Sequence, residues 1–258
     1  MKHILTTAAA VLIAVTAAQA QHPSQTWNPD KGSHYVNPVL NADYSDPDVC
    51  RVGDDFYMTS SSFACFPGLQ ILHSTDLVNW EIIGAALTDY PGCNWSDERP
   101  WETLSQQLDR PYDDVPGPEQ WRTVPQHGNG VWAPAIRYHN GEFYIYCGDP
   151  DRGVFMVKTK DPRGKWELHA VIPHFHDASF FFDDDGRTYM LYGTGMIREL
   201  KPDLTGVLEG GLDMKLFERD KEENNLLEGS RMIKHDGKYC LLMISWPRGG
   251  IRREVCYR

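Results

Sequence analysis

Three acidic residues, Asp46, Asp177 and Glu228, each begin a segment of the chain, and these segments resemble one another in sequence. Each segment continues through a short apolar run and a turn to a tyrosine, 11 or 12 residues beyond the acid. A fourth segment of the same kind begins at Trp132. If the four segments are repeats around a common axis, equivalent positions face that axis. The sequence therefore predicts that the three carboxyl groups converge on one pocket.

Converging carboxyl groups can hydrolyse a glycosidic bond. One carboxylic acid protonates the leaving oxygen, and a second carboxylate on the opposite face of the sugar activates water or attacks directly. A third carboxyl group can orient the acid and raise its pKa, because neighbouring like charges disfavour ionisation. An aspartate before a proline, such as Asp46, can also simply begin a strand or cap a turn. Three acids in matched register favour the catalytic interpretation.

The segments that carry these acids are predicted to be β-hairpins. Apolar and aromatic runs flank the pairs Asn140-Gly141, Asp185-Gly186 and Asp236-Gly237. An Asn-Gly or Asp-Gly pair between two such runs is a strong signal for a tight hairpin turn. Each acid is therefore expected at the start of the first strand of a hairpin.

Further strands are predicted outside the hairpins. A third strand is expected from Gly68, Gly153 and Gly250, and a fourth opens after Trp80 and Trp166. Four antiparallel strands repeated roughly every 45–50 residues are typical of a β-propeller. Helical periodicity is almost absent, so the predicted fold is all-β. A generic β-sandwich would not explain the matched register of the acids.

One stretch interrupts the repeat. Residues 85–130 separate the first hairpin from the second and are rich in proline and tryptophan. A long loop of this composition in a compact fold is usually functional or disordered. We expect it to form a rim beside the pocket.

The N-terminus has the pattern of an export signal. Lys2 precedes an apolar run from Ile4 to Ala18, and Ala18-Gln19-Ala20 is a small-x-small cleavage site. We therefore expect residues 1–20 to be a signal peptide, residues 21–258 to form one propeller catalytic domain, and the protein to be periplasmic or secreted. No cysteine follows the expected cut and no second long apolar stretch is present, so no membrane anchor is expected.

The amino-acid composition limits the kinds of molecule that the protein can be expected to bind. The net charge of −11 disfavours binding to phosphate backbones, so nucleic acid is excluded as a partner. Aromatic residues make up 12% of the chain, which favours stacking against carbohydrate. The cysteine spacing forms no recognised disulfide framework and leaves pairing open, but three cysteines fall in strand-like runs and are expected to be buried free thiols: Cys50, Cys147 and Cys240.

Several motifs together carry a family resemblance. The runs Ser45-Asp46-Pro-Asp-Val-Cys, Gly130-Val-Trp-Ala-Pro-Ala, Asp177-Ala-Ser-Phe-Phe-Phe and Glu228-Gly-Ser resemble glycoside hydrolase family 43. So does the segment that begins at His73 with Ser-Thr-Asp-Leu-Val-Asn-Trp. The motifs occur in the family's order and cover nearly the whole chain after residue 20.

The resemblance implies a five-bladed β-propeller that hydrolyses β-xylosides or α-L-arabinofuranosides with inversion. It implies that Asp46 is the general base, Glu228 the general acid and Asp177 the residue that tunes the pKa of the acid. Trp132 and Phe63 match aromatic positions that line the sugar pocket. The expected partner is accordingly a pentose-containing oligosaccharide or polysaccharide.

The chain departs from the family's pattern at several points. His176 stands where some members carry an aromatic residue, and Glu228 is followed by Gly-Ser instead of the commoner Gly-Pro. Members often hold a calcium ion on the axis, partly through a histidine of the last blade. No such segment is present in this sequence, so no metal and no cofactor are expected.

Two alternatives stay open. A related group of retaining enzymes acts on fructosides, but its Asn-Asp-Pro-Asn-Gly-like motif differs from Ser45-Asp46-Pro-Asp48. The other alternative is a propeller that binds sugar without cleaving it.

The spacing of the outer strands also predicts that Arg258 ends the sequence before the outer strand of a fourth blade, with no fifth blade. Such a chain is expected to be an inactive or poorly soluble fragment.

Overall fold

The computed structural model describes residues 34–35, 37–63, 65–88, 130–149, 153–172, 175–219, 221 and 223–258. Its strands form four antiparallel sheets, called blades 1 to 4 in chain order. Blade 1 contains β1 (Asp48–Val52), β2 (Asp55–Thr59), β3 (Gly68–Ser74) and β4 (Glu81–Leu87). Blade 2 contains β5 (Trp132–His139), β6 (Glu142–Asp149), β7 (Gly153–Thr159) and β8 (Glu167–Ile172).

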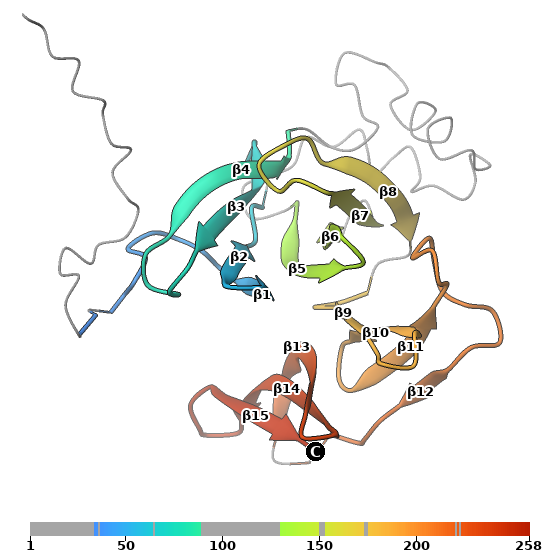
Figure 1. Cartoon of the computed structure of the whole chain (residues 1–258). Helices are drawn as coiled ribbons and strands as arrows, with labels where there is room; N and C mark the ends of the chain where they lie inside the picture. The colour runs from blue at the N-terminus through green and yellow to red at the C-terminus, as the bar shows by residue number, and fades with distance from the viewer. Residues whose placement is uncertain are drawn as a thin grey trace, which may run out of the picture.

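The remaining strands form the other two blades. Blade 3 contains β9 (Ser179–Phe182), β10 (Thr188–Tyr192), β11 (Met196–Leu200) and β12 (Asp213–Lys215). Blade 4 contains β13 (Glu223–His235), β14 (Lys238–Pro247) and β15 (Arg253–Tyr257). The blades follow one another around a common axis, and β1, β5, β9 and β13 lie nearest to it (Figure 1). The prediction of an all-β propeller with about four blades is confirmed.

The strand pattern agrees with the sequence in most places. β3 and β7 begin at Gly68 and Gly153, as predicted. β15 begins at Arg253 and not at Gly250, because the Gly250 N–H donates to the Pro247 carbonyl oxygen and closes a turn. Blade 3 has outer strands that the sequence did not predict, since β11 follows the turn at Gly193 without the glycine start of the other units.

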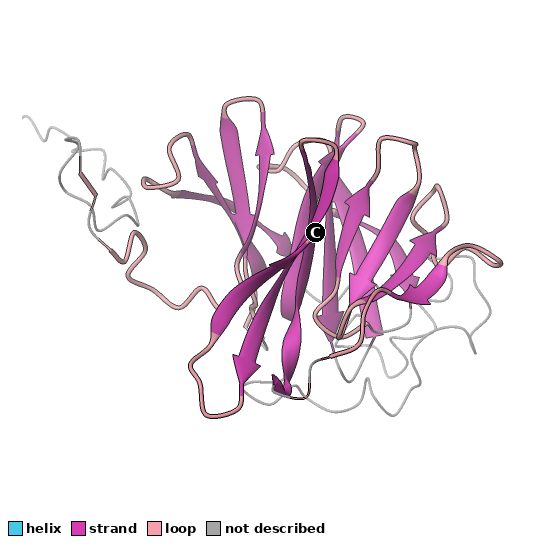
Figure 2. Cartoon of the chain, turned by 90° about the horizontal axis from the view of Figure 1, so that it is seen from below, coloured by secondary structure: helices cyan, strands magenta, loops and turns pink. Residues whose placement is uncertain are grey.

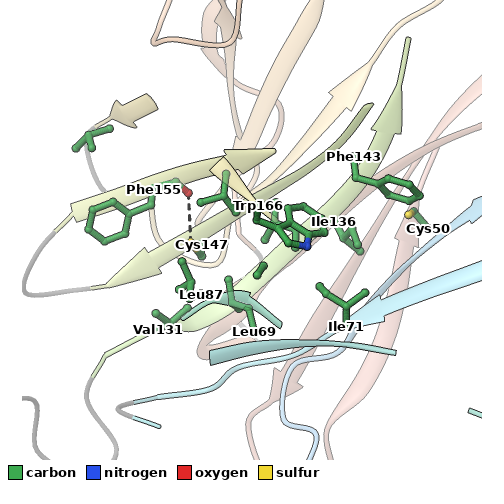
Figure 3. Packing of buried hydrophobic residues seen from close by; sticks show 14 residues of the cluster. Cys50, Leu69, Ile71, Leu87, Val131, Ile136, Phe143, Cys147, Phe155 and Trp166 are labelled. Carbon is green, nitrogen blue, oxygen red and sulfur yellow. Dashed lines mark hydrogen bonds between the residues drawn. The ribbon is translucent and has the colours of Figure 1, made fainter. Parts of the chain in front are cut away.

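Neighbouring blades pack face to face. Between blades 1 and 2 the core includes Leu69, Ile71, Ile136 and Phe155, all fully buried (Figure 3). Similar apolar layers lie between blades 2 and 3 and between blades 3 and 4. Seen from the side, the blades stand as separate upright sheets, and the described residues contain no helix (Figure 2). Packed sheets of this kind fix the first strand of each blade relative to its neighbours.

The four tyrosines used to align the repeats in the sequence do not occupy equivalent positions in the four blades. Tyr57, Tyr144 and Tyr189 pack with the core between their own blade and the next one. Tyr239 instead contacts Phe181 of the preceding blade, with ring centroids 6.0 Å apart. The tyrosine of blade 4 is therefore not equivalent to the others, and counting back from it misplaces that blade's register.

The corrected register makes Asp46 and Asp177 equivalent and places Glu228 one residue earlier. Asp46 and Asp177 have φ angles of 50° and 46°, and the matching positive φ in blade 4 belongs to Gly229, at 70°. In blade 2 the matching positive φ belongs to Ala133, at 39°, so Trp132 also lies one residue earlier. Glu228 therefore occupies the position that His176 occupies in blade 3. The expectation of three acids in one register is wrong in this respect.

Some of the expectations from the sequence fall partly or wholly on residues that the structure does not describe. Residues 1–20 and most of the stretch 85–130 lie outside the described residues, although residues 85–87 belong to β4 and not to a loop. Cys93 also lies outside them. The expected burial of three cysteine thiols is confirmed, and the described cysteines are all free: Cys50, Cys65, Cys147, Cys240 and Cys256. Within the described part, no helix is long and apolar enough to cross a membrane.

Candidate active site

Asp46 stands directly before β1, at the axial end of blade 1. Its Oδ2 atom accepts a hydrogen bond of 2.7 Å from the Ser61 hydroxyl. The Ser61 Oγ atom in turn accepts a bond of 2.8 Å from the N–H of Ala133, at the start of β5. The Ser61 N–H donates to the Ser45 carbonyl oxygen. Ser61 therefore ties the carboxylate of blade 1 to the backbone of blade 2, which holds Asp46 in a fixed orientation.

Asp177 stands in the same position on blade 3. The strand that follows it is anchored, because the buried Ser179 hydroxyl donates to the Ser230 carbonyl oxygen of blade 4 at 2.6 Å. The Asp177 side chain is 21% exposed. Partial burial raises its pKa above the usual value. The nearby charges of Glu228 and Asp46 also raise this pKa, while His176 and Arg231 oppose the shift.

Glu228 contacts the residue beside Asp177. The Glu228 Oε2 atom lies 2.8 Å from His176 Nε2, and the same nitrogen lies 3.9 Å from Asp177 Oδ2. The Glu228 side chain is 24% exposed. The three groups come from two adjacent blades and share one small volume. The fold therefore brings Asp177 and Glu228 together, and the electrostatic effect of Asp46 on Asp177 places all three acids in one neighbourhood.

These acids lack cationic partners of the usual kind. Among the described residues, no lysine or arginine lies within ion-pair distance of Asp46, Asp177 or Glu228. Their carboxyl oxygens are therefore not held in ion pairs with lysine or arginine, which leaves them open to a substrate or water. The arrangement can donate a proton from one group and withdraw one from water with another.

The two aromatic candidates are near neighbours in sequence of Ser61 and Ala133, the residues of the hydrogen-bonded link to Asp46. The backbone of Phe63 pairs with that of Val131 through two hydrogen bonds of 3.0 Å, so Phe63 lies beside the residue that precedes Trp132. Trp132 is 37% exposed at the start of β5. An exposed tryptophan beside carboxyl groups has the chemistry to stack on a sugar ring.

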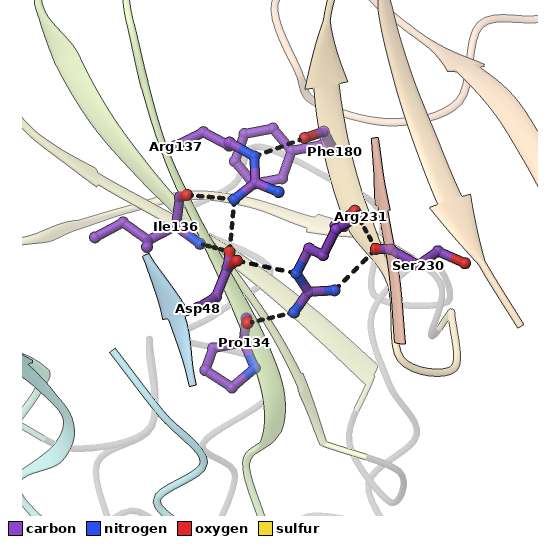
Figure 4. Close-up of polar contacts among 8 residues, drawn as sticks. Asp48, Pro134, Ile136, Arg137, Phe180, Ser230 and Arg231 are labelled. Atoms are coloured by element: carbon purple, nitrogen blue, oxygen red, sulfur yellow. Dashed lines mark hydrogen bonds and ion pairs between the residues drawn. The ribbon is translucent and has the colours of Figure 1, made fainter. Parts of the chain in front are cut away.

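A second carboxylate, Asp48, lies two residues after Asp46 and has a different environment (Figure 4). Asp48 is 7% exposed. Its Oδ2 lies 2.6 Å from Arg137 and its Oδ1 lies 2.9 Å from Arg231. The Ile136 N–H also donates to Oδ2 at 2.8 Å. Burial alone would raise the pKa of Asp48, but the two guanidinium groups and the backbone donor outweigh it and hold the pKa below its usual value.

The Asp48 cluster joins all four blades. Arg137 of β5 donates to the Phe180 carbonyl oxygen of β9 at 3.1 Å, and Arg231 of β13 donates to the Pro134 carbonyl oxygen at 3.3 Å. A cavity of about 540 Å³ adjoins this cluster, and none of the three candidate acids lines it. The candidate site is therefore the end of the blades that carries Asp46 and Asp177, whereas the carboxylate at the cavity is fully paired.

The described residues offer little to a metal ion. On the axis, the carboxylate of Asp48 is occupied by two cationic side chains, which does not fit a calcium ion. His176, Asp177 and Glu228 offer donor atoms within 4.8 Å of one another. Calcium binds six to eight oxygen atoms, so this set is too small and contains a nitrogen. The expectation that the protein needs no metal or cofactor stays a prediction.

Three residues of this site carry functions that the sequence did not reveal. Ser61 donates a hydrogen bond to Asp46, Arg231 opposes the rise in the pKa of Asp177, and His176 contacts Glu228. His176 was visible in the sequence only as a departure at one position. Its equivalence to Glu228 on the neighbouring blade was the signal that could have identified it, and the shifted register of blade 4 concealed that signal.

Comparisons with known proteins identify a family for the chain. Residues 35–257 match the family described as "Glycosyl hydrolases family 43". A "Putative beta-xylosidase" of Xylanibacter ruminicola is 31% identical over 87% of this chain and 37% of its own length. A "Xylosidase/arabinosidase" of Butyrivibrio fibrisolvens is 34% identical over 83% of this chain and 35% of its own length. The chain thus spans little more than a third of these relatives.

Solved structures that resemble this chain are also described as GH43 proteins. A protein described as "Bifunctional GH43-CE Bacteroides eggerthii" has a TM-score of 0.68 and 34% identity, and covers 85% of this chain and 27% of its own. A "GH43_12 retrieved from capybara gut metagenome" has a TM-score of 0.67 and 32% identity, and covers 89% of this chain and 42% of its own.

Proposed function

Because the chain belongs to glycosyl hydrolases family 43, we propose that it hydrolyses pentose glycosides of the β-xyloside or α-L-arabinofuranoside type. The names of the relatives support this substrate class, since they are called beta-xylosidase and xylosidase/arabinosidase. The expected natural substrate is an oligosaccharide or polysaccharide of hemicellulose. The observation that carries the proposal is the group of three carboxyl groups that lacks paired arginine or lysine in the described residues.

The proposed mechanism inverts the anomeric configuration. Asp46, held by the Ser61 hydroxyl, takes a proton from the attacking water. Glu228 donates a proton to the leaving oxygen on the opposite face of the sugar. Inversion needs room for a water between the two carboxyl groups, which corresponds to a separation of roughly 6.5–9.5 Å.

Asp177 is proposed to keep Glu228 in its working protonation state. The two carboxyl groups are close enough to interact, since the charge of Glu228 contributes to the raised pKa of Asp177. Trp132 and Phe63 are proposed to contact the sugar from the side of blade 2 and blade 1. Trp132 offers an exposed aromatic surface for this purpose.

Hydrolysis of aryl pentosides tests the proposal. The proposal predicts that the chain releases the aryl alcohol from an aryl β-D-xyloside, an aryl α-L-arabinofuranoside or both, a result that would overturn the expectation of an inactive fragment. An Asp46→Ala variant with the same thermal stability is the control. Sugar binding by calorimetry without any turnover would contradict the proposal and favour a non-catalytic sugar-binding propeller.

Export is a separate proposal that rests on residues 1–20. Expression in a Gram-negative host is expected to yield a periplasmic protein whose mass corresponds to a start at Gln21. A protein that retains Met1 and stays in the cytoplasmic fraction would contradict this proposal.

A further inference from the structure

The His176 side chain lies within hydrogen-bond distance of the proposed acid. Its Nε2 atom is 2.8 Å from Glu228 Oε2, a distance typical of a hydrogen bond to a carboxyl group. His176 lies in a turn, and its own carbonyl oxygen accepts a hydrogen bond of 2.9 Å from the Gly193 N–H. The backbone of His176 is therefore held by its own blade, while its ring reaches the next one.

The contact follows from the symmetry of the fold. His176 and Glu228 each stand one residue before a positive-φ position, at Asp177 in blade 3 and at Gly229 in blade 4. Equivalent positions of adjacent blades face the same axis, so the two side chains meet there. When the ring nitrogen carries a hydrogen, its N–H donates to Oε2, which accepts. The acidic proton of Glu228 is then on Oε1, from which it can pass to the leaving oxygen.

We propose that His176 is a positioning residue that holds the carboxyl group of Glu228 in the orientation needed to protonate the leaving oxygen. This inference rests on the proposed function of Glu228 as general acid. The 54% exposure of the His176 side chain places the ring at the open surface of the site, where it can hold the acid without filling the sugar pocket.

The charged groups around Glu228 do not offer a substitute for this contact. Asp46 and Asp177 are acids and cannot donate to a carboxylate when ionised. Arg231 is bound to Asp48 at 2.9 Å. Across the sheet, Glu228 is paired with Ile244 of β14, and Ile244 is paired with Glu254 of β15. Removal of the imidazole therefore leaves Glu228 without a described hydrogen-bond partner on that side.

The experiment compares two variants on two substrates. His176→Leu removes the hydrogen bond, whereas His176→Gln keeps an N–H donor at about the place of Nε2. The substrates are aryl pentosides of the same sugar, one with an activated leaving group such as 2,4-dinitrophenol and one with a poor leaving group such as phenol. Protonation by Glu228 matters only for the poor leaving group.

The proposal predicts a loss that depends on the leaving group. For His176→Leu, kcat on the phenyl pentoside falls roughly 10–100-fold, as expected when a catalytic group is misplaced. The change on the dinitrophenyl substrate is within a few-fold, and His176→Gln restores most of the lost rate. An equal loss on both substrates, or a Gln variant that behaves like the Leu variant, overturns the proposal.

A double variant separates positioning from direct contact with the sugar. In a Glu228→Ala background, His176→Leu is expected to cause no further loss, because the group it positions is gone. A further loss or a raised KM in that background would overturn the proposal in favour of sugar binding by His176. If Glu228→Ala alone shows no dependence on the leaving group, the proposed function fails instead, so the two failures are distinguishable.

Discussion

Asp46 and Asp48 lie two residues apart in the same blade and differ in almost every physical respect. Asp48 is 7% exposed and is bound by two arginines and a backbone N–H. Asp46 is exposed at the end of the strand and accepts one hydrogen bond from a serine. Asp48 links the four blades through its two arginines, whereas Asp46 is open to solvent and forms no ion pair with the described lysines and arginines.

The difference shows how one strand can serve both stability and chemistry. A buried ion pair stabilises the folded state only while both partners are present, and the loss of one partner leaves a buried charge without compensation. A catalytic carboxylate must stay free of such partners, at some cost to stability. Asp46 lies just outside β1 and is available for chemistry, whereas Asp48 lies inside β1 and serves stability.

The largest expected effect comes from loss of Asp46. Asp46→Ala is expected to lower kcat on every pentoside substrate by roughly 10²–10⁴-fold, because no other group is placed to activate the water. The melting temperature should change little. Asp54→Ala, on the exposed turn of the same hairpin, is the matched control and should keep full activity. Substantial residual turnover by Asp46→Ala would contradict the catalytic role that distinguishes Asp46 from the structural Asp48.

Loss of Glu228 should affect only substrates that need a proton. Glu228→Ala is expected to reduce turnover of phenyl pentosides by roughly 10²–10⁴-fold and to leave dinitrophenyl pentosides nearly unaffected. Steady-state kinetics on the two substrates measures the ratio. Equal losses on both would assign the role of acid to another residue.

Loss of Asp48 should act on stability and not on proton transfer. Asp48→Ala leaves Arg137 and Arg231 unpaired in a buried site, which is expected to cost about 3–5 kcal/mol of unfolding free energy. Because the pKa of Asp48 is lowered on folding, its stabilising effect is present above the unfolded pKa of about 4 and is lost as the pH falls through the folded value.

Thermal unfolding of wild type and Asp48→Ala at neutral and acidic pH tests this. The difference in melting temperature should be largest at neutral pH and should shrink below about pH 4. Asp48→Asn is the control that keeps the shape and removes the charge. A melting temperature unchanged by either substitution would contradict the structural role of the cluster.

The smallest effect is expected at Asp177, and its sign is opposite to that at Asp48. The folded state raises the pKa of Asp177, so this group favours folding below its unfolded pKa, and that contribution is lost as the pH rises through the folded value. Asp177→Asn is therefore expected to raise the melting temperature at neutral pH by about 2–4 °C, roughly 1 kcal/mol. The gain should vanish below about pH 4, and activity should fall. A lower melting temperature at neutral pH would assign Asp177 a structural role.

The sequence predicted the blades well because the relevant signals are local. Asn140-Gly141 and Asp236-Gly237 mark turns between adjacent strands, and such turns need no information from distant residues. The grouping of the three acids also followed from the repeat. The structure corrected the register of Glu228, because Tyr239 of blade 4 takes a different position from the tyrosines of the other blades.

The Asp48 cluster could not be read from the sequence. Arg137 and Arg231 lie 89 and 183 positions from Asp48, and each looks like an ordinary charged residue in a strand. Their pairing depends on how four blades meet at the axis. The role of His176 depends on the same geometry, since its partner Glu228 lies 52 positions away.

The stereochemistry of hydrolysis tests the central claim most directly. Proton NMR of the sugar first formed from an aryl pentoside distinguishes the two anomers before they equilibrate. Asp46 acting through water, with Glu228 as acid, predicts that the first product has the configuration opposite to that of the substrate. A first product that retains the substrate's configuration would contradict the assignment of Asp46 as general base.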